Sequence, residues 1–208
     1  MGIYEFAGCV VSYEPLYGLL RRRMETYRSD TEGQPDITLD GTKEDYEKLR
    51  KQYPHLSIEE CEYSCAGAEF YMKLLKHQGF MIHASAVEKE GKAYLFSAPS
   101  GTGKSTHAQL WRQTFKGEPI RIINDDKPAV CLQNGVFYAC GTPFSGKTDK
   151  NENRKAPIQG LCMLHRGKTN KIQKITSGEA LPLILPQTLF YGDEEETNLL
   201  LSFLDRFL

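Results

Sequence analysis

Residues 98–105 read APSGTGKS, and this glycine-rich stretch decides how the rest of the chain is interpreted. The apolar run AYLF at residues 93–96 precedes it and predicts a strand. Residues 106–115 follow it and place apolar side chains on one helical face, which predicts a helix. A glycine turn between a strand and a helix is the context that a phosphate-binding P-loop requires. The sequence therefore predicts a P-loop.

Each residue type in this loop has a physical task. Gly101 and Gly103 let backbone N–H groups converge on phosphate oxygens at the positive end of the following helix. Lys104 would reach the outer phosphates, and the Ser105 hydroxyl would hold a magnesium ion. The predicted nucleotide-binding residues are Ser100, Gly101, Thr102, Gly103, Lys104, Ser105 and Thr106. The alternative is a Gly/Ser turn that caps an ordinary helix.

The loop departs from the usual pattern at one position. Ala98 stands where the pattern has its first glycine. We expect the loop to tolerate alanine here, because this position must be small more than it must reach a positive φ.

The composition bounds the class of protein. A chain of 208 residues suits one domain with a sizeable core and room for a small appended lobe. Hydrophobic residues at 40% and charged residues at 25% are ordinary for a globular protein, and a net charge of −1 gives no support to nucleic-acid or general membrane-surface binding. The N-terminus lacks a basic region followed by a long apolar core, so the expected location is cytoplasmic.

The six cysteines lack the paired spacing of a zinc site and do not form a dense disulfide framework. We expect reduced, buried thiols. Cys61 and Cys65 lie four residues apart on a predicted helix, where core neighbours are favoured over metal ligands.

Residues 1–79 are predicted to form a strand and helix lobe packed on the core. Residues 3–13 are rich in Tyr, Phe and Val and predict one strand, and residues 37–39 predict a second, short one. Residues 19–27 predict a short helix whose three arginines, at 21–23, either face solvent or contact an anionic partner; a solvated face is favoured.

Two capping boxes mark helix starts in this lobe. Residues 42–45 (TKED) open a short charged helix that ends near residue 52, before a proline. Residues 57–60 (SIEE) open a long helix that continues to residue 77 and is ended by Gly79.

Residues 80–87 predict a strand that is separated from the P-loop strand only by the turn at residues 88–91. So short a link predicts a hairpin with antiparallel strands, unlike the common parallel P-loop fold. Alternation places His83 and Ser85 on one face of this strand. His83 is either a core histidine or a site residue, and its place beside the P-loop strand favours the site.

Residues 120–123 predict a strand that ends in Asn-Asp-Asp. Two adjacent carboxylates, Asp125 and Asp126, about twenty residues after the P-loop lysine are typical of a pair that binds a metal and supplies a base. The alternative is a polar turn closed by the Lys-Pro pair that follows.

Residues 129–132 and 136–140 flank Gln-Asn-Gly and predict another hairpin. The glycine-bounded loop at residues 141–147 carries a lysine that either approaches the phosphates or belongs to a surface turn. The charged residues 147–156 predict a mobile loop over the site.

The C-terminal part completes the predicted core of residues 80–208. Residues 158–165 and 171–175 predict a last strand pair. Residues 177–180 start a short helix that two prolines interrupt, and residues 193–208 form an amphipathic closing helix.

The order of these features resembles a known family. The segment IHASA at residues 82–86, a short hairpin, the loop at residues 100–105 and the Asn-Asp-Asp strand end occur in the order of the phosphoenolpyruvate carboxykinase-like fold. That fold joins ATP-dependent phosphoenolpyruvate carboxykinases to the catalytic domain of HPr kinase/phosphorylase. The resemblance covers about residues 80–175 and is closest to the small HPr-kinase-like proteins, some of which accompany peptide-modification gene clusters. It implies an α/β fold with a mixed, largely antiparallel sheet and flanking helices.

The resemblance also implies roles for residues. Lys104 would neutralise the β- and γ-phosphates, Ser105 and Asp126 would hold magnesium, and Asp125 would take the proton from the attacking hydroxyl. His83 matches a histidine near the transferred phosphoryl group, where it would be a metal or phosphate ligand. The chain lacks a counterpart of the separate N-terminal domain of HPr kinase, its Glu-x-Arg-Gly signature and the carboxylate-binding arginines of a carboxykinase. Phosphorylation of HPr and carboxykinase activity are therefore not expected.

The predicted function is an ATP- and Mg²⁺-dependent phosphotransferase with Asp125, His83 and Lys104 as catalytic residues. Its acceptor would be a hydroxyl, on a serine of a peptide or small protein or on a small molecule, with no nucleic acid or membrane partner. An oligomer is compatible with the sequence. The alternatives are a non-catalytic ATP-binding sensor or scaffold, and a nucleotide hydrolase.

Overall fold

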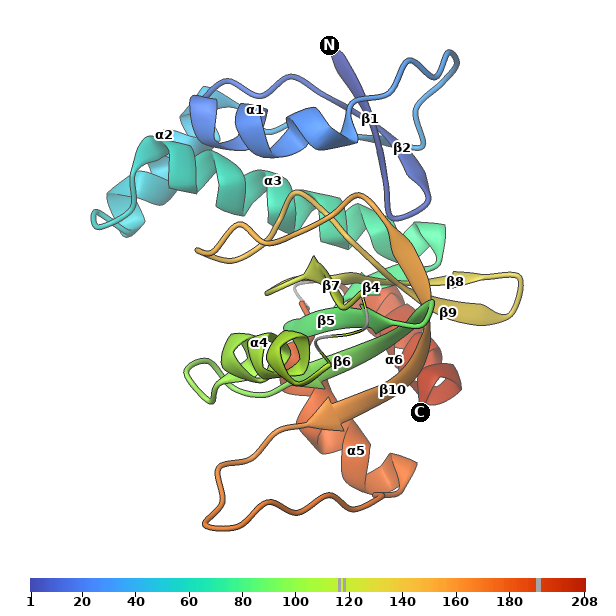
Figure 1. Cartoon of the computed structure of the whole chain (residues 1–208). Helices are drawn as coiled ribbons and strands as arrows, with labels where there is room; N and C mark the ends of the chain where they lie inside the picture. Colours follow the sequence, from blue (N-terminus) through green and yellow to red (C-terminus); the bar gives the residue numbers. More distant parts are fainter. Residues whose placement is uncertain (116, 118, 190–191) are drawn as a thin grey trace.

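The computed structural model describes residues 1–115, 117, 119–189 and 192–208. Within these residues it is an α/β structure with one large and one small mixed sheet (Figure 1). The large sheet has the strand order β4-β8-β9-β10-β6-β5-β7, and among the described residues only β6 and β10 pair in parallel. Its strands are β4 (Gly79–Met81), β5 (Ala84–Lys89), β6 (Lys92–Ser97), β7 (Arg121–Asn124), β8 (Ala129–Gln133), β9 (Val136–Cys140) and β10 (Lys155–Met163). The predicted mixed and largely antiparallel sheet is confirmed.

The small sheet consists of β1 (Gly2–Phe6), β2 (Cys9–Tyr13) and β3 (Ile37–Thr38). The prediction of one strand over residues 3–13 is wrong, because the chain reverses at Ala7 and Gly8 and β1 pairs with β2 antiparallel. Both turn residues have positive φ, 54° and 77°, as a two-residue hairpin turn requires. An alanine is rare in that conformation, so the turn carries no strong sequence signal.

Two of the three helices of the N-terminal lobe begin where the capping boxes predict. The three helices are α1 (Gly18–Met24), α2 (Lys43–Gln52) and α3 (Ile58–Leu74), and 3₁₀ turns follow α1 at Glu25–Tyr27 and α3 at Leu75–His77. The Thr42 and Ser57 side chains each accept a hydrogen bond from the third helical residue, whose carboxylate bonds back to the cap. Gln78, with φ 60°, takes the left-handed position that we expected of Gly79.

Helix α3 lies between the small sheet and the large one, and α1 runs beside it (Figure 1). Phe70 of α3 packs on Phe6 of β1 and on Phe144, with ring centroids 4.7 and 5.7 Å apart. Phe144 is fully buried and directly precedes residues 145–154, which run along the end of β7. The aromatic core under the small sheet thus fixes the start of the segment at residues 145–154.

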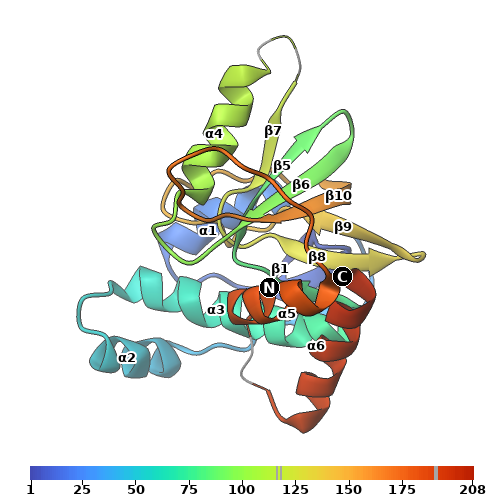
Figure 2. The same cartoon turned by 90° about the horizontal axis from the view of Figure 1, so that it is seen from below.

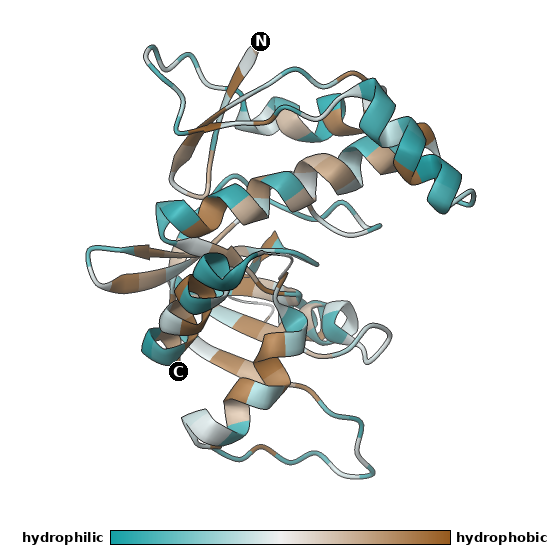
Figure 3. Ribbon diagram, turned by 180° about the vertical axis from the view of Figure 1, so that it is seen from behind, coloured by the Kyte–Doolittle hydropathy of each residue, from teal (hydrophilic) through white to brown (hydrophobic). Residues whose placement is uncertain are grey.

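Helices flank the large sheet on two sides (Figure 2). Alternate residues of a strand face opposite sides, so neighbouring Leu95 and Phe96 of β6 enter different hydrophobic clusters. Phe96 packs on Ala108 of α4 (Lys104–Thr114), whereas Leu95 belongs to the cluster that contains Ile184 and Phe203. These last two lie on α5 (Ser177–Ile184) and α6 (Glu194–Phe207). Figure 3 shows hydrophobic residues along the strands of the large sheet and α2 hydrophilic along most of its length.

The prediction of one strand over residues 80–87 is wrong. The chain leaves β4, which pairs with β8, and enters β5, which pairs with β6 and β7, so the strand breaks at Ile82 and His83. Backbone atoms in the break find partners outside the ladder, since His83 N–H donates to the Gln187 carbonyl at 2.7 Å and Ala84 N–H to that of Asp126 at 3.1 Å. The hairpin from β5 to β6 is confirmed, with its turn at Glu90 and Gly91.

The C-terminal part differs from the prediction in two respects. Residues 171–175 form no strand and are exposed, while β10 begins at Lys155 and pairs with β9 and β6 instead. Pro182 lies inside α5 rather than ending it, and Pro186 lies in the 3₁₀ turn Leu185–Gln187. The hairpin of β8 and β9 around Asn134 and the closing helix α6 are confirmed.

We expect Gly141→Ala to destabilise the fold by about 3 kcal/mol or more, the upper range for overpacking. A methyl group there would lie 1.8 Å from the Glu152 carbonyl oxygen and 2.9 Å from that of Ile123, both backbone atoms that cannot step aside. Urea unfolding followed by circular dichroism measures the loss. Gly178→Ala is the matched control: its methyl group meets no atom, and alanine in a helix should raise stability by up to about 1 kcal/mol. Equal effects of the two changes would contradict the packing argument.

Candidate phosphate site

The glycine loop connects the end of β6 at Ser97 to the first residue of α4, Lys104. Gly101 and Gly103 have φ of 77° and 118°, and a Cβ on either would meet no atom within 4 Å. The backbone conformation, not crowding, is therefore what demands glycine at these positions. Ala98 is fully buried and has no positive φ, as expected for a position that only needs to be small.

Lys104 is buried, with only 7% of its surface exposed. Its ammonium group folds back and donates to the Ala98 carbonyl at 2.9 Å. Burial lowers the pKa of Lys104, and the negative charges of Asp126 and Asp125 oppose that shift. The amine therefore lies within electrostatic reach of both predicted carboxylates. Of the remaining loop residues, Ser100, Gly101 and Thr106 are exposed and Thr102 and Ser105 are half-buried.

The two aspartates follow β7, and Asn124 at the end of that strand holds their turn. Its side-chain oxygen accepts hydrogen bonds from the backbone N–H groups of Asp126 and Lys127, at 3.0 and 2.8 Å. Its amide donates to the Thr142 carbonyl at 3.2 Å. The sequence predicts no separate role for Asn124, although an asparagine at the start of a polar turn is the usual residue for such backbone bonds.

Asp125 is buried, with 3% of its surface exposed, and both carboxylate oxygens have hydroxyl partners. The Ser85 hydroxyl lies 3.1 Å from Oδ1, and the Thr148 hydroxyl donates to Oδ2. The backbone N–H of Asp125 donates to the Lys150 carbonyl at 3.0 Å. This carboxylate is therefore held in one orientation and faces a hydroxyl from a separate segment.

Asp126 is more accessible and pairs with His83. The His83 Nε2 atom lies 3.2 Å from Asp126 Oδ1, and each side chain is about one-quarter exposed. Nδ1 of His83 lies 3.2 Å from the Gln187 side-chain oxygen, so both ring nitrogens face oxygen atoms. A ring protonated on both nitrogens would donate a hydrogen bond to each oxygen. Burial by itself would raise the pKa of Asp126, but the hydrogen bond with His83 and the charges of Lys127, His83 and Lys104 outweigh it and lower that pKa.

His83 reaches this place by a route that strand alternation did not predict. It lies in the break between β4 and β5, where the backbone bond to Gln187 fixes it. Gln187 itself is buried and comes from the distant 3₁₀ turn after α5. No sequence signal connects that turn to the aspartates.

The expectation that residues 21–23 form a solvated basic face is wrong for Arg23. Its side chain is 10% exposed, and it donates to the backbone carbonyls of Ser145 and Gly146 at 2.6 and 3.2 Å. Gly146 in turn packs on Asp126, because a Cβ there would lie 3.0 Å from the Cβ of Asp126. Lys147 is exposed, and its charge acts on Glu60 at the start of α3.

Arg166 is a further basic residue at the loop, and the sequence predicts no site role for it. Its guanidinium donates to the Gly101 carbonyl at 2.5 Å, from the exposed segment after β10. A cation thus lies at the outer edge of the glycine turn.

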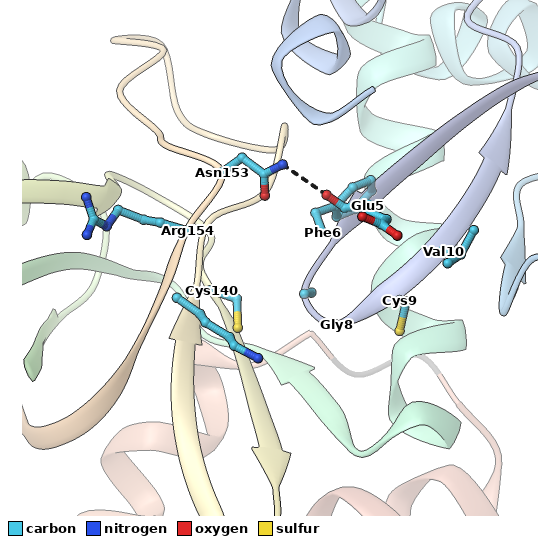
Figure 4. A pocket seen from close by; sticks show the side chains of 10 residues that line it. Glu5, Phe6, Gly8, Cys9, Val10, Cys140, Asn153 and Arg154 are labelled. Atoms are coloured by element: carbon cyan, nitrogen blue, oxygen red, sulfur yellow. Dashed lines mark hydrogen bonds between the residues drawn. The ribbon is translucent and has the colours of Figure 1, made fainter. Parts of the chain in front are cut away.

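A separate cavity of about 400 Å³ lies between the turn of β1 and β2 and the facing β9 and β10. Figure 4 shows Glu5, Cys9 and Asn153 around it, and the Asn153 side-chain amide donates to the Glu5 carbonyl at 3.1 Å. None of the predicted site residues lines it. The six cysteines are free, and burial raises the pKa of Cys9, which lines this cavity, to about 12, so its thiol is neutral near pH 7.

We expect Asp126→Asn to lose stability at neutral pH but not in acid. A carboxyl whose pKa is lowered by folding stabilises the fold above its unfolded-state value, ordinarily 3.8, and this contribution disappears as the pH falls through the lower folded-state pKa. The difference in unfolding free energy between wild type and variant should therefore be full at pH 5 and shrink toward pH 2. Denaturant titrations across this range measure it. A difference that grows in acid would contradict the assigned pairing.

No family model matches this chain, and a search of curated proteins found no match to it. In the part of the chain that the structure describes, no helix has both the length and the apolar character needed to cross a membrane.

Proposed function

We propose that this protein is an ATP-dependent phosphotransferase with a phosphoenolpyruvate carboxykinase-like P-loop fold, similar to the small HPr-kinase-like proteins. One observation carries the proposal. The buried Lys104 of a glycine loop lies within electrostatic reach of Asp125 and Asp126, and His83 contacts the second of these. Elements from three parts of the chain, α4, the end of β7 and the break before β5, bring these groups together.

The residues fit a nucleotide with magnesium. Gly101 and Gly103 leave open space on the loop, and the following helix presents its positive end there. Ser105 and Asp126 offer the oxygen ligands that magnesium prefers. No cluster of three or more histidines, cysteines or carboxylates among the described residues could hold a metal ion alone. An ion at this site would thus depend on phosphate and water ligands, as is usual for magnesium bound with ATP.

The remaining residues divide the work of phosphoryl transfer. Magnesium, when bound, would neutralise charge on the phosphates. Lys104 would hold the outer phosphates, and His83, as a cation, would stabilise charge on the transferred group. Asp125 would accept the proton of the acceptor hydroxyl; the contact from Thr148 supports this role, because it brings a hydroxyl to an otherwise buried carboxylate.

The alternatives differ in what they require. A non-catalytic ATP sensor or scaffold needs the loop and a metal ligand but no second, buried carboxylate. A hydrolase needs a group that orients water. The presence of Asp125 in addition to Asp126 favours the transferase. We further propose a cytoplasmic protein whose acceptor is a hydroxyl on a peptide, a small protein or a small molecule; a net charge of −1 gives no support for nucleic acid.

Incubation with γ-labelled ATP and magnesium tests this proposal. We expect the label in a phosphate monoester on at least one member of a panel of serine- and threonine-bearing peptides and small hydroxyl compounds, with ADP formed in equal amount. Free phosphate formed at the same rate with and without acceptors would indicate a hydrolase. Nucleotide binding without ADP formation would indicate a sensor or scaffold.

A further inference from the structure

The hydroxyl that contacts the proposed base belongs to the protein itself. Thr148 lies in the segment between β9 and β10, and its side chain is exposed except where the hydroxyl donates to Asp125 Oδ2. An acceptor substrate would have to place its own hydroxyl against the same carboxylate. Thr148 therefore stands where the proposed reaction needs an acceptor.

The segment that carries Thr148 is built to hold this position. On one side, Arg23 donates to the carbonyls of Ser145 and Gly146, and the Tyr63 hydroxyl donates to the Ser145 carbonyl at 2.8 Å. On the other side, the Lys150 carbonyl accepts the backbone N–H of Asp125. Thr148 is thus fastened to the site from both directions.

A tight turn between these anchors presents the threonine. Asp149, with φ 49°, closes the turn by donating its backbone N–H to the Gly146 carbonyl at 3.1 Å. Its carboxylate accepts hydrogen bonds from Ser145 at 3.0 Å and from Asn151 at 3.2 Å, and lies 3.1 Å from Arg23 Nε. The turn is therefore ordered by charge and hydrogen bonds rather than by chance contact.

Ser85, the other hydroxyl on Asp125, is a different case. It is fully buried in β5 and also lies 3.0 Å from the Asp125 backbone carbonyl, so it serves to orient the carboxylate. Thr148 is solvent-accessible, projects from a loop and contacts only the side chain of Asp125 among the hydrogen bonds of its hydroxyl within the described residues. Of these two hydroxyls, only Thr148 can receive a phosphoryl group without disrupting the core.

We propose that Thr148 is a phosphoryl acceptor and that the protein phosphorylates itself there, within one chain. This inference rests on the proposed function. In the reaction the Thr148 oxygen forms a bond to the γ-phosphorus of ATP, and the bond from that phosphorus to the β,γ-bridging oxygen breaks. ADP leaves with that electron pair, and Asp125 takes the hydroxyl proton. The products are phosphothreonine, ADP and one proton.

The test is label transfer from γ-labelled ATP and magnesium to the purified protein, with the labelled residue identified by peptide mass spectrometry. We expect label on Thr148, at a first-order rate that does not change between about 1 and 50 µM protein, as a unimolecular step requires. Thr148→Val should lose this label and Thr148→Ser should keep it. Thr169→Val is the matched control, since it removes an exposed hydroxyl elsewhere.

Every outcome decides the inference. Label on Thr148 with a concentration-independent rate supports it. Label on external acceptors but not on Thr148 overturns it and leaves the proposed function standing. A rate that rises in proportion to protein concentration overturns transfer within one chain. Absence of label on the protein and on the whole acceptor panel overturns both the inference and the proposed function.

Discussion

Asp125→Asn is expected to lower the rate of phosphoryl transfer by roughly 10²–10⁴-fold, the range that a positioned general base supplies. The fold should survive, because asparagine keeps the shape of aspartate. One side-chain oxygen can still accept the Ser85 hydroxyl, and the amide can donate to the Thr148 hydroxyl, which accepts as readily as it donates. Binding of ATP with magnesium should change little, since a base acts in the transition state.

Steady-state kinetics and calorimetry separate the two effects. Asp30→Asn, at an exposed position in the N-terminal lobe, is the matched control and should leave both unchanged. Should Asp125→Asn lose affinity for ATP with magnesium while keeping its rate of transfer, Asp125 would be the metal ligand and Asp126 the base.

Lys104→Met is expected to weaken ATP affinity by about 1.5–3 kcal/mol, the scale of a lost charge-assisted contact. The same change should not lower the melting temperature of the nucleotide-free protein. Lys104 is buried, its pKa is lowered by that burial, and its main hydrogen bond is to one carbonyl. An apolar side chain of similar length therefore removes the free-energy cost of burying the ammonium group.

A loss of ATP affinity with an unchanged melting temperature distinguishes a binding residue from a structural one. Lys76→Met, on an exposed lysine of the 3₁₀ turn after α3, should change neither quantity. A large fall in melting temperature with unchanged ATP affinity would show that Lys104 serves the fold alone.

The local elements of the fold were largely readable from the sequence, because their signals are local. The capping boxes at Thr42 and Ser57 predict helices, and Asn134 followed by glycine predicts a hairpin. Residues 98–105 likewise have a strand before them and a helix after them. In each case a few adjacent residues satisfy one another, so no distant part of the chain is needed to define the element.

The sequence-based predictions are wrong where contacts between distant segments determine the structure. The break at His83 depends on Gln187, 104 residues further along the chain, and on Asp126, which is also distant in sequence. No pattern near His83 indicates it. Arg23 is not on a solvated helix face, because its guanidinium donates hydrogen bonds to the carbonyls of Ser145 and Gly146. Strand β10 finds a parallel partner in β6, so residues 171–175 are left without a strand to pair with.

The residues of the candidate site also differ in whether local sequence or distant contacts place them. Lys104 and the two aspartates could be named from the sequence because Lys104 begins α4 and the aspartates directly follow β7, and both elements are predictable. Thr148 and Arg166 could not, since each comes from an irregular segment whose path is set by tertiary contacts.

The central claim is that the glycine loop binds the phosphates of a nucleotide. The single tryptophan, Trp111, lies on α4 and packs on Phe96 of β6, so its fluorescence reports on the helix that begins at the loop. Titration with ATP, ADP, AMP and adenosine in the presence of magnesium is the most direct measurement. We predict that affinity falls in that order and that adenosine gives no saturable change. Equal affinity for all four compounds, or no response to ATP, would contradict a phosphate-binding loop at residues 98–105.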